Sequence, residues 1–206
     1  AKDTEQYPDY DKSLEADLRT SLNIFLDNIV WQTAGADFRK LLNSRHLPLN
    51  ERLARLYGAQ RVLGGTTIHL GEFGPSFFDH ERAGLLTHPY LLALYSYHSG
   101  TSPIHRGVFV TRHVLGRSLK PPPEAVVFKD EAFAPDMTMR EKVTQLTKPD
   151  ACMTCHGIIN PLGFALEQFD GIGRLRKTEK GRPINTISDY LSADGSAVRL
   201  TSAGDL

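Results

Sequence analysis

The chain has 206 residues, enough for one large domain or two small domains with a buried core. Lysine plus arginine and aspartate plus glutamate balance at 24 each, so no net charge favours nucleic acid or an anionic membrane as a partner. Hydrophobic residues make up 40% of the chain, and polar residues and a proline interrupt its most apolar segment, residues 85–97. This composition is that of a soluble globular protein without a transmembrane segment.

The N-terminal part is predicted to be helical. Apolar side chains recur at steps of four, four, three and four residues from Leu14 to Ile29, the spacing of a helix with one buried face. Asn50 is expected to cap a short helix that ends at Gly58. The glycine-rich stretch 64–71 indicates a turn with a short strand or a loop.

Two more helix starts follow in the middle of the chain. Thr87 with Pro89 marks one, and Ser102 with Pro103 marks the next, because a hydroxyl side chain followed by proline is typical of a helix N-terminus. The second of these helices is expected to stop at Gly116.

The C-terminal part begins after three consecutive prolines at residues 121–123, which must be extended. Thr138 and Glu141 form a capping-box pattern that opens a polar helix. After Gly171 the chain becomes rich in arginine, lysine, glycine and serine, which indicates turns and short strands up to Leu206. The chain ends without an obvious stop, so we expect it to be part of a longer protein.

The only two cysteines lie in the pentapeptide Cys152-Met153-Thr154-Cys155-His156. Two thiols at this spacing, followed at once by histidine, match covalent haem attachment, in which the thiols add to the two vinyl groups and the histidine binds the iron. We therefore predict one covalent haem c, with Cys152 and Cys155 as thioethers and His156 as the proximal iron ligand. Because such attachment occurs outside the cytoplasm in bacteria, a periplasmic or otherwise exported location is expected.

The predicted fold is mainly α, with a helical body packed around a C-terminal, cytochrome c-like haem segment that has a few short strands and long loops. The predicted organisation is a helical domain at 1–120, a proline-rich linker at 121–136 and the haem-binding segment at 137–206.

Three other uses of the cysteine motif are a zinc site, a redox pair and a structural disulfide. A zinc site requires four ligands, and beyond Cys152, Cys155 and His156 only a distant histidine is available. A thioredoxin-like redox pair requires a hydrophobic strand before the motif, whereas residues 141–150 are polar and helix-like. A disulfide across so short a loop would stabilise little.

The proximal histidine needs a hydrogen-bond acceptor for its Nδ1–H, which fixes the tautomer and the basicity of the ring. We expect a backbone carbonyl in the segment 160–162, because Pro161 holds that turn close to His156. The alternative is that Pro161 merely ends the helix that carries the motif.

The sixth iron ligand decides between electron transfer and ligand chemistry. His105 is the first choice, since it lies near the start of a predicted helix, and Met139 is the second. His98 and Met137 follow, and an open position is the remaining alternative. Three arginines are candidates for pairing with haem propionates: Arg106, Arg174 and Arg176. Four aromatic residues are expected to line the core or the haem pocket: Trp31, Phe109, Phe164 and Phe169.

The sequence resembles the planctomycete-type cytochrome c proteins, which are large secreted proteins built from several domains. The segments that carry the resemblance are 50–58, 101–110, 115–116, the three prolines, 152–156, 160–167 and 169–173. The resemblance covers most of the chain in the expected order. It implies a haem-c-bearing module of a multidomain exported protein, with further domains upstream.

The leading functional hypothesis is a monohaem electron-transfer module that works with a redox partner protein and with other domains or subunits of a larger assembly. Whether the chain is an enzyme is left open, with electron transfer favoured over catalysis. The alternatives are a peroxidase- or oxidase-type haem enzyme with an open distal site, or a scaffold subunit stabilised by haem.

Overall fold

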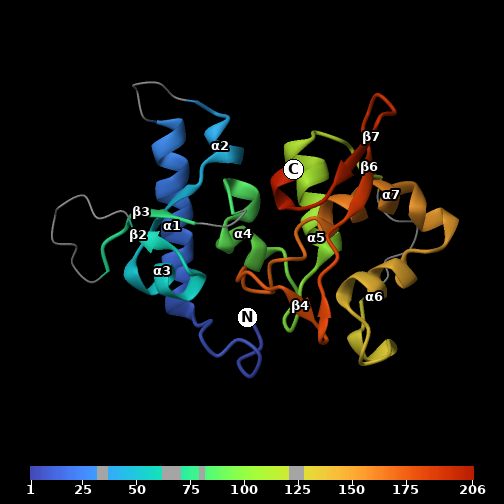
Figure 1. Cartoon of the computed structure of the whole chain (residues 1–206), viewed down its shortest axis with the longest axis horizontal. Helices are drawn as coiled ribbons and strands as arrows, with labels where there is room; N and C mark the ends of the chain where they lie inside the picture. Colours follow the sequence, from blue (N-terminus) through green and yellow to red (C-terminus); the bar gives the residue numbers. More distant parts are fainter. Residues whose placement is uncertain (32–36, 62–70, 79–81, 121–127) are drawn as a thin grey trace. The chain divides into compact units, whose positions relative to one another are not determined.

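A computed structural model of the chain describes residues 1–31, 37–61, 71–78, 82–120 and 128–206 (Figure 1). These residues contain seven α-helices and a few short strands, and 44% of them are helical, so the mainly α prediction is confirmed. The prolines at 121–123 and almost all of the glycine-rich stretch 64–71 lie outside the described residues.

The described residues divide into two compact units. Unit 1 comprises residues 1–94 and 169–175, and unit 2 comprises residues 95–168 and 176–206. The division therefore falls at a different place from the predicted boundaries at 120 and 136. The reason is that the helix beginning at Pro103 packs against the helix that carries Cys152, Cys155 and His156.

Unit 1 combines four helices with one sheet. In chain order its elements are α1 (Lys12–Val30), α2 (Lys40–Asn43), β1 (His46–Leu49), α3 (Glu51–Tyr57), β2 (Gln60–Arg61), β3 (Gly74–Phe77), a 3-10 turn at Leu85–Thr87 and α4 (Pro89–Leu94). Strand β3 lies between β1 and β2 in an antiparallel sheet, with His46 opposite Phe77 and Leu49 opposite Gly74.

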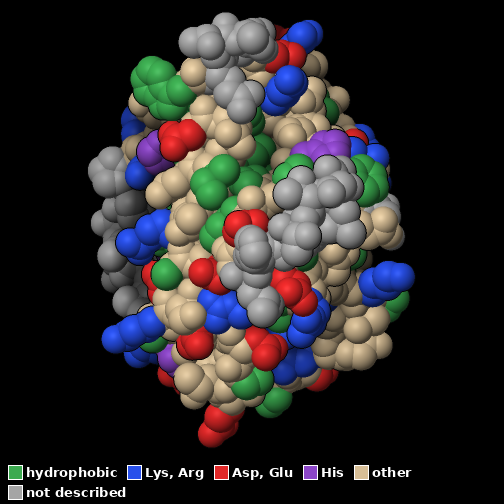
Figure 2. All heavy atoms as spheres, turned by 90° about the vertical axis from the view of Figure 1, so that its left-hand side faces the viewer, with side chains coloured by type: hydrophobic (Ala, Val, Ile, Leu, Met, Phe, Trp, Pro, Cys, Tyr) green, Lys and Arg blue, Asp and Glu red, His purple; other side chains and the backbone are tan. Residues whose placement is uncertain are grey.

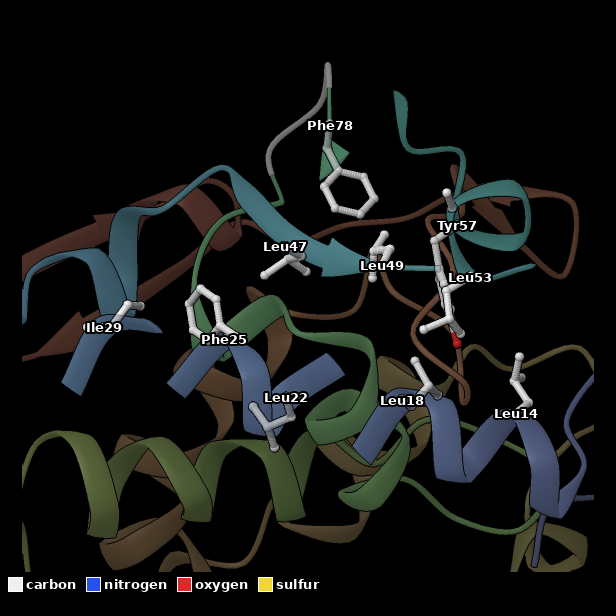
Figure 3. Packing of buried hydrophobic residues seen from close by; sticks show 11 residues of the cluster. Leu14, Leu18, Leu22, Phe25, Ile29, Leu47, Leu49, Leu53, Tyr57 and Phe78 are labelled. Atoms are coloured by element: carbon white, nitrogen blue, oxygen red, sulfur yellow. The ribbon is translucent and has the colours of Figure 1, made fainter. Parts of the chain in front are cut away.

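The apolar spacing in the first helix is confirmed. Helix α1 begins where the Asp11 carboxylate accepts a hydrogen bond from the Leu14 N–H at 2.6 Å. Its buried stripe packs against β1, α3 and the residue after β3 (Figure 3). The apolar residues of this core are Leu14, Leu18, Leu22, Phe25, Ile29, Leu47, Leu49, Leu53, Ala54, Tyr57 and Phe78.

Helix α3 has the predicted ends. The Asn50 side chain accepts a hydrogen bond from the Leu53 N–H at 2.9 Å, and Gly58 follows the helix with a left-handed φ of 69°. Glycine adopts this conformation without the steric cost that a Cβ would bring.

A buried arginine ties residues 169–175 into unit 1. Arg82 is fully buried, and its guanidinium lies 4.6 Å from the centre of the Phe169 ring. It donates a hydrogen bond of 2.6 Å to the Gly173 carbonyl, while the Tyr57 hydroxyl donates one of 2.9 Å to the Ile172 carbonyl. Burial lowers the pKa of Arg82 to about 10, so the side chain stays charged at neutral pH.

Unit 2 contains three helices and two short hairpins. Its elements are α5 (Pro103–Phe109), a π-helical segment at Val110–Val114, a 3-10 turn at Asp130–Ala132, α6 (Met139–Leu146), α7 (Asp150–Phe164), β4 (Thr178–Glu179), β5 (Arg182–Pro183), β6 (Ser188–Leu191), β7 (Ala197–Leu200) and a 3-10 turn at Ala203–Asp205. Strand β4 pairs with β5, and β6 pairs with β7, both antiparallel.

The helix starts at Ser102 and Thr138 are confirmed. The Ser102 hydroxyl accepts a hydrogen bond from the His105 N–H at the start of α5. Thr138 and Glu141 form a complete capping box on α6, in which each side chain accepts from the other residue's backbone N–H.

Helices α5 and α7 approach each other through glycines. A Cβ on Gly107 would lie 2.1 Å from the Ile159 carbonyl oxygen, and one on Gly163 would lie 2.0 Å from the Pro103 carbonyl oxygen. Both distances are far below van der Waals contact, so only glycine fits at either position. The two contacts fix α7 along the length of α5.

One residue that was predicted to be buried, Trp31, lies on the surface. Trp31, expected to line the core or the haem pocket, is 76% exposed, because α1 ends at Val30 and its buried stripe ends at Ile29. Acidic and basic side chains are interspersed on the face shown in Figure 2. No helix among the described residues is long and apolar enough to span a membrane.

Alanine at the two contact glycines will destabilise the protein. Gly107→Ala and Gly163→Ala each force a Cβ into a backbone carbonyl, which we expect to lower the free energy of unfolding by about 1–3 kcal/mol or more. Gly157→Ala is the matched control in α7, since its Cβ meets only the Met153 Cε at 3.9 Å. That control should be neutral or stabilising by about 0.5–1 kcal/mol. Urea unfolding measures all three, and equal effects would contradict the close approach.

The buried histidine His88 should make unit 1 less stable in acid. His88 is fully buried; its Nδ1 accepts a hydrogen bond from the Tyr90 N–H, so its Nε2–H donates to the Ser21 hydroxyl. Burial, reinforced by the nearby charge of Arg82, lowers the pKa of His88 from 6.5 to about 3.

Between these two pKa values the unfolded chain binds a proton that the folded unit excludes. The contribution of His88 to stability is therefore complete above pH 6.5 and is lost toward pH 3, by up to about 1.4 kcal/mol per pH unit. Urea unfolding across this range checks the slope. His88→Gln should flatten it, whereas His46→Gln, a change at an exposed histidine, should not.

Candidate functional site

The predicted haem motif occupies the first two turns of helix α7. Cys152, Cys155 and His156 stand at positions i, i+3 and i+4, so their side chains lie on one side of the helix. Both cysteines are free thiols and are partly exposed, as is the histidine. Helix α6 precedes the motif in the chain, as the sequence predicted, and no strand leads into it.

A chain of three hydrogen bonds holds the His156 ring. His156 Nδ1 lies 2.9 Å from the Asn160 Oδ1, one turn further along α7. The Asn160 amide nitrogen donates to the Thr147 hydroxyl at 2.9 Å, and that hydroxyl donates to the Val143 carbonyl at 2.8 Å. Asn160 and Thr147 are buried, so water does not compete for the two bonds that Thr147 makes, whereas the bond to His156 is partly buried.

The direction of each bond follows from the one before it. Thr147 gives its single proton to Val143, so it must accept from the Asn160 amide group. Asn160 therefore presents its carbonyl oxygen to His156, and the proton of the neutral imidazole must be on Nδ1. This tautomer leaves the Nε2 lone pair free to bind a metal.

The prediction that a backbone carbonyl accepts from His156 is wrong, although the acceptor does lie in the predicted segment. The sequence favoured a backbone carbonyl at 160–162, whereas the structure uses the side chain of Asn160. The carbonyl of Pro161 instead accepts hydrogen bonds from the Ala165 N–H and the Ser188 hydroxyl. A helical backbone directs its carbonyls along its own axis, so they point away from a side chain on the preceding turn.

The alternative role for Pro161, as the end of the helix, is also wrong. Helix α7 continues through Pro161 to Phe164. Proline has no N–H, so the Gly157 carbonyl lacks its partner within the helix. The turns beyond Pro161 are held from outside, by Gly163 against Pro103 and by the Ser188 bond.

A surface cavity of about 790 Å³ lies beside His156 and Asn160. It is lined by helices α6 and α7 and by β6 and β7, and it includes the basic residues Arg140, Lys148 and Arg199. Its volume is within the range of small-molecule sites, about 300–1,000 Å³. His156 is thus reachable from outside on one side of α7.

The first-choice sixth ligand, His105, lies on helix α5 and not on the helix that carries His156. His105 is exposed on α5, with its ring edge-on to Tyr97 at 5.3 Å between centres. Pro103 and Gly107 of α5 lie against α7, and a position two residues from each projects from the opposite side of the helix.

The second choice, Met139, packs near the C-terminal end of α7. It is buried in a cluster with Val143 and Phe164. Phe164 lies eight residues beyond His156 on α7, which is about 12 Å along the helix axis at a rise of about 1.5 Å per residue. Of the lower choices, His98 is exposed and Met137 is partly buried before α6.

The three candidate propionate arginines all contact carboxylates of the chain. Arg106 and Arg176 lie 3.7 Å and 3.1 Å from the buried Glu167, which also accepts a hydrogen bond from the Thr101 hydroxyl. Arg174 pairs with Asp170 at 2.8 Å. Burial raises the pKa of Glu167, and the charges of Arg176 and Arg106 oppose this rise.

Of the aromatic residues expected near the core, Phe164 and Phe169 are buried and Phe109 is partly buried against Tyr95, with ring centres 4.8 Å apart. Among the described residues, no group of three or more histidine, cysteine, aspartate or glutamate side chains is arranged to hold a metal ion. The residues present fit a covalent haem through the chemistry of their donors: two free thiols and one imidazole with an available Nε2.

Sequence reasoning missed Asn160 and Thr147. The signal for Asn160 was available, because an asparagine four residues after a helical histidine lies beside it. Thr147 lies outside helix α7, so its contact with Asn160 depends on how α6 and α7 pack, which no spacing shows.

Two models of planctomycete-type cytochrome c domain families, whose function is unknown, match parts of the chain. Residues 82–179, which include the haem motif, match the family model PSCyt3, described as a protein of unknown function (DUF1588). Residues 1–59 match PSD4, described as a protein of unknown function (DUF1592). No curated protein and no solved structure matches the chain.

The Glu167 cluster is expected to be structural. Glu167→Gln removes the charge that balances buried Arg106, and breaking such a pair costs about 3–5 kcal/mol of unfolding free energy. Glu179→Gln is the matched control, since Glu179 contacts the same Arg176 at 3.6 Å but is less buried, and it should cost about 1 kcal/mol or less. Urea unfolding compares them, and equal losses would contradict this assignment.

Proposed function

We propose that this chain is a monohaem c-type cytochrome module that transfers single electrons outside the cytoplasm. The observation that carries the proposal is the arrangement on α7: Cys152, Cys155 and His156 share one side of the helix, and the Asn160 bond keeps His156 in the tautomer with Nε2 available. The similarity to cytochrome c domain families supports the same reading.

The chain's own residues would hold the haem covalently. Each thiol of Cys152 and Cys155 would add across one vinyl group: the sulfur bonds to one carbon, the thiol proton goes to the other, and nothing is released. His156 would bind the iron through Nε2. A haem held in this way supplies a one-electron centre whose potential depends on its axial ligands, its burial and nearby hydrogen bonds.

A carrier of this kind works with other proteins. The proposal therefore includes a redox partner protein and further domains or subunits of a larger assembly. It also includes export, because thioether attachment requires the extracytoplasmic apparatus.

The test is export of the chain in cells that possess this apparatus. We expect haem absorbance that stays with the polypeptide after denaturation, because thioethers survive unfolding. Cys152→Ala combined with Cys155→Ala should abolish this absorbance. Met153→Ala changes an exposed residue between the two cysteines and should leave it intact.

Two results would contradict the proposal. The first is a wild-type protein without covalent haem, in cells that load another c-type cytochrome. The second is rapid, tight binding of cyanide or carbon monoxide by the loaded protein, which would indicate a haem enzyme with an open site instead of a carrier.

A further inference from the structure

We propose that Asn160 is a positioning residue for the iron ligand, and that its neutral amide oxygen, oriented by Thr147, sets how strongly His156 donates electrons to the iron. This inference rests on the proposed function, because it concerns the potential of the same site. It goes beyond that function by assigning control of the potential to two residues outside the haem motif.

The acceptor at Nδ1 determines the electronic character of the ring. An acceptor that draws the Nδ1 proton makes the imidazole more basic, and a more basic ligand stabilises oxidised iron. A carboxylate draws this proton most strongly, a neutral amide less, and an apolar side chain not at all. With Asn160, the reduction potential should therefore lie between the value for a carboxylate and the value for an apolar side chain at this position.

Thr147 decides which end of the Asn160 amide faces His156. The hydroxyl accepts from the amide nitrogen at 2.9 Å because its own proton is committed to the Val143 carbonyl. Without the Thr147 hydroxyl, the Asn160 amide nitrogen has no acceptor that directs it away from the His156 ring. Its nitrogen could then face His156 and would favour the other tautomer, in which Nε2 carries the proton and cannot bind iron.

The position of Asn160 is itself well fixed. The side chain is 6% exposed, and its neighbours in α7, Ile159 and Gly163, form the close contacts with α5. An acceptor held by the helix crossing cannot move away from His156 with solvent fluctuations, in contrast to a surface asparagine.

The experiment compares reduction potentials of the haem-loaded chain and its variants. We expect Asn160→Asp to lower the potential and Asn160→Leu to raise it, with wild type between them. The expected change in the oxidation equilibrium is about tenfold, typical of residues that support a metal ligand, or about 59 mV for one electron.

Thr147→Val should shift the potential in the same direction as Asn160→Leu. It provides a second test of the inference if the leucine variant does not fold. Thr144→Val is the matched control, since Thr144 is an exposed residue of α6 that lines the same cavity. Equal potentials for wild type, Asn160→Leu and Thr147→Val would overturn the inference, as would a shift of equal size in the control.

A second measurement does not depend on haem. Nitrogen NMR of the haem-free chain should show His156 with its proton on Nδ1, and Thr147→Val should mix in the other tautomer. A wild-type ring protonated on Nε2 would overturn the inference. If the wild type shows the expected tautomer but never acquires covalent haem, the proposed function fails while the hydrogen-bond chain stands.

Discussion

The crossing of helices α5 and α7 is the constraint on which the candidate site depends. Gly107 and Gly163 bring the two backbones into direct contact, and no side chain at either position can adjust to a different spacing. Because these contacts lie in the second half of α7, they fix the direction in which the first half, with Cys152 and His156, extends. The site is thus rigid at one end and accessible at the other.

The same crossing explains why polar groups can be buried so close to the motif. Asn160 is enclosed because Ile159 and Gly163 beside it are packed on α5, and its amide is satisfied by Thr147 and His156. A buried amide costs free energy unless it finds partners, so the hydrogen bonds and the packing require each other. A change at a contact glycine would therefore disturb the ring of His156 without touching it.

Most of the local structure could be predicted, because its causes are local. The apolar stripe from Leu14 to Ile29, the Asn50 cap and the Thr138 capping box each depend on residues within a few turns, and each is found. The predictions that failed concern residues whose structure depends on tertiary contacts. Pro161 was expected to break or turn the chain, yet contacts beyond it hold the helix, and Trp31 was assigned to the core although the buried stripe of α1 ends before it.

The site shows the same limit. The motif residues and their positions on one helix follow from spacing alone, whereas Asn160 with Thr147 depends on how α6 meets α7. The proposed sixth ligands were chosen by residue type and motif position, but the side of α5 that faces α7 is set by glycines, which places His105 on the opposite side. A residue's chemistry is visible in a sequence, and its direction in space is not.

The segment 169–175 gives the chain an unusual connectivity. It supplies unit 1 with the Phe169 ring and the Ile172 and Gly173 carbonyls that surround Arg82 and Tyr57, yet it is linked on both sides to residues of unit 2. Unit 1 therefore cannot be excised as one continuous stretch of polypeptide. Cutting the chain after residue 94 would remove the Phe169 ring and the Gly173 carbonyl from the buried Arg82 guanidinium, so residues 1–94 depend on a segment that follows most of unit 2 in the chain.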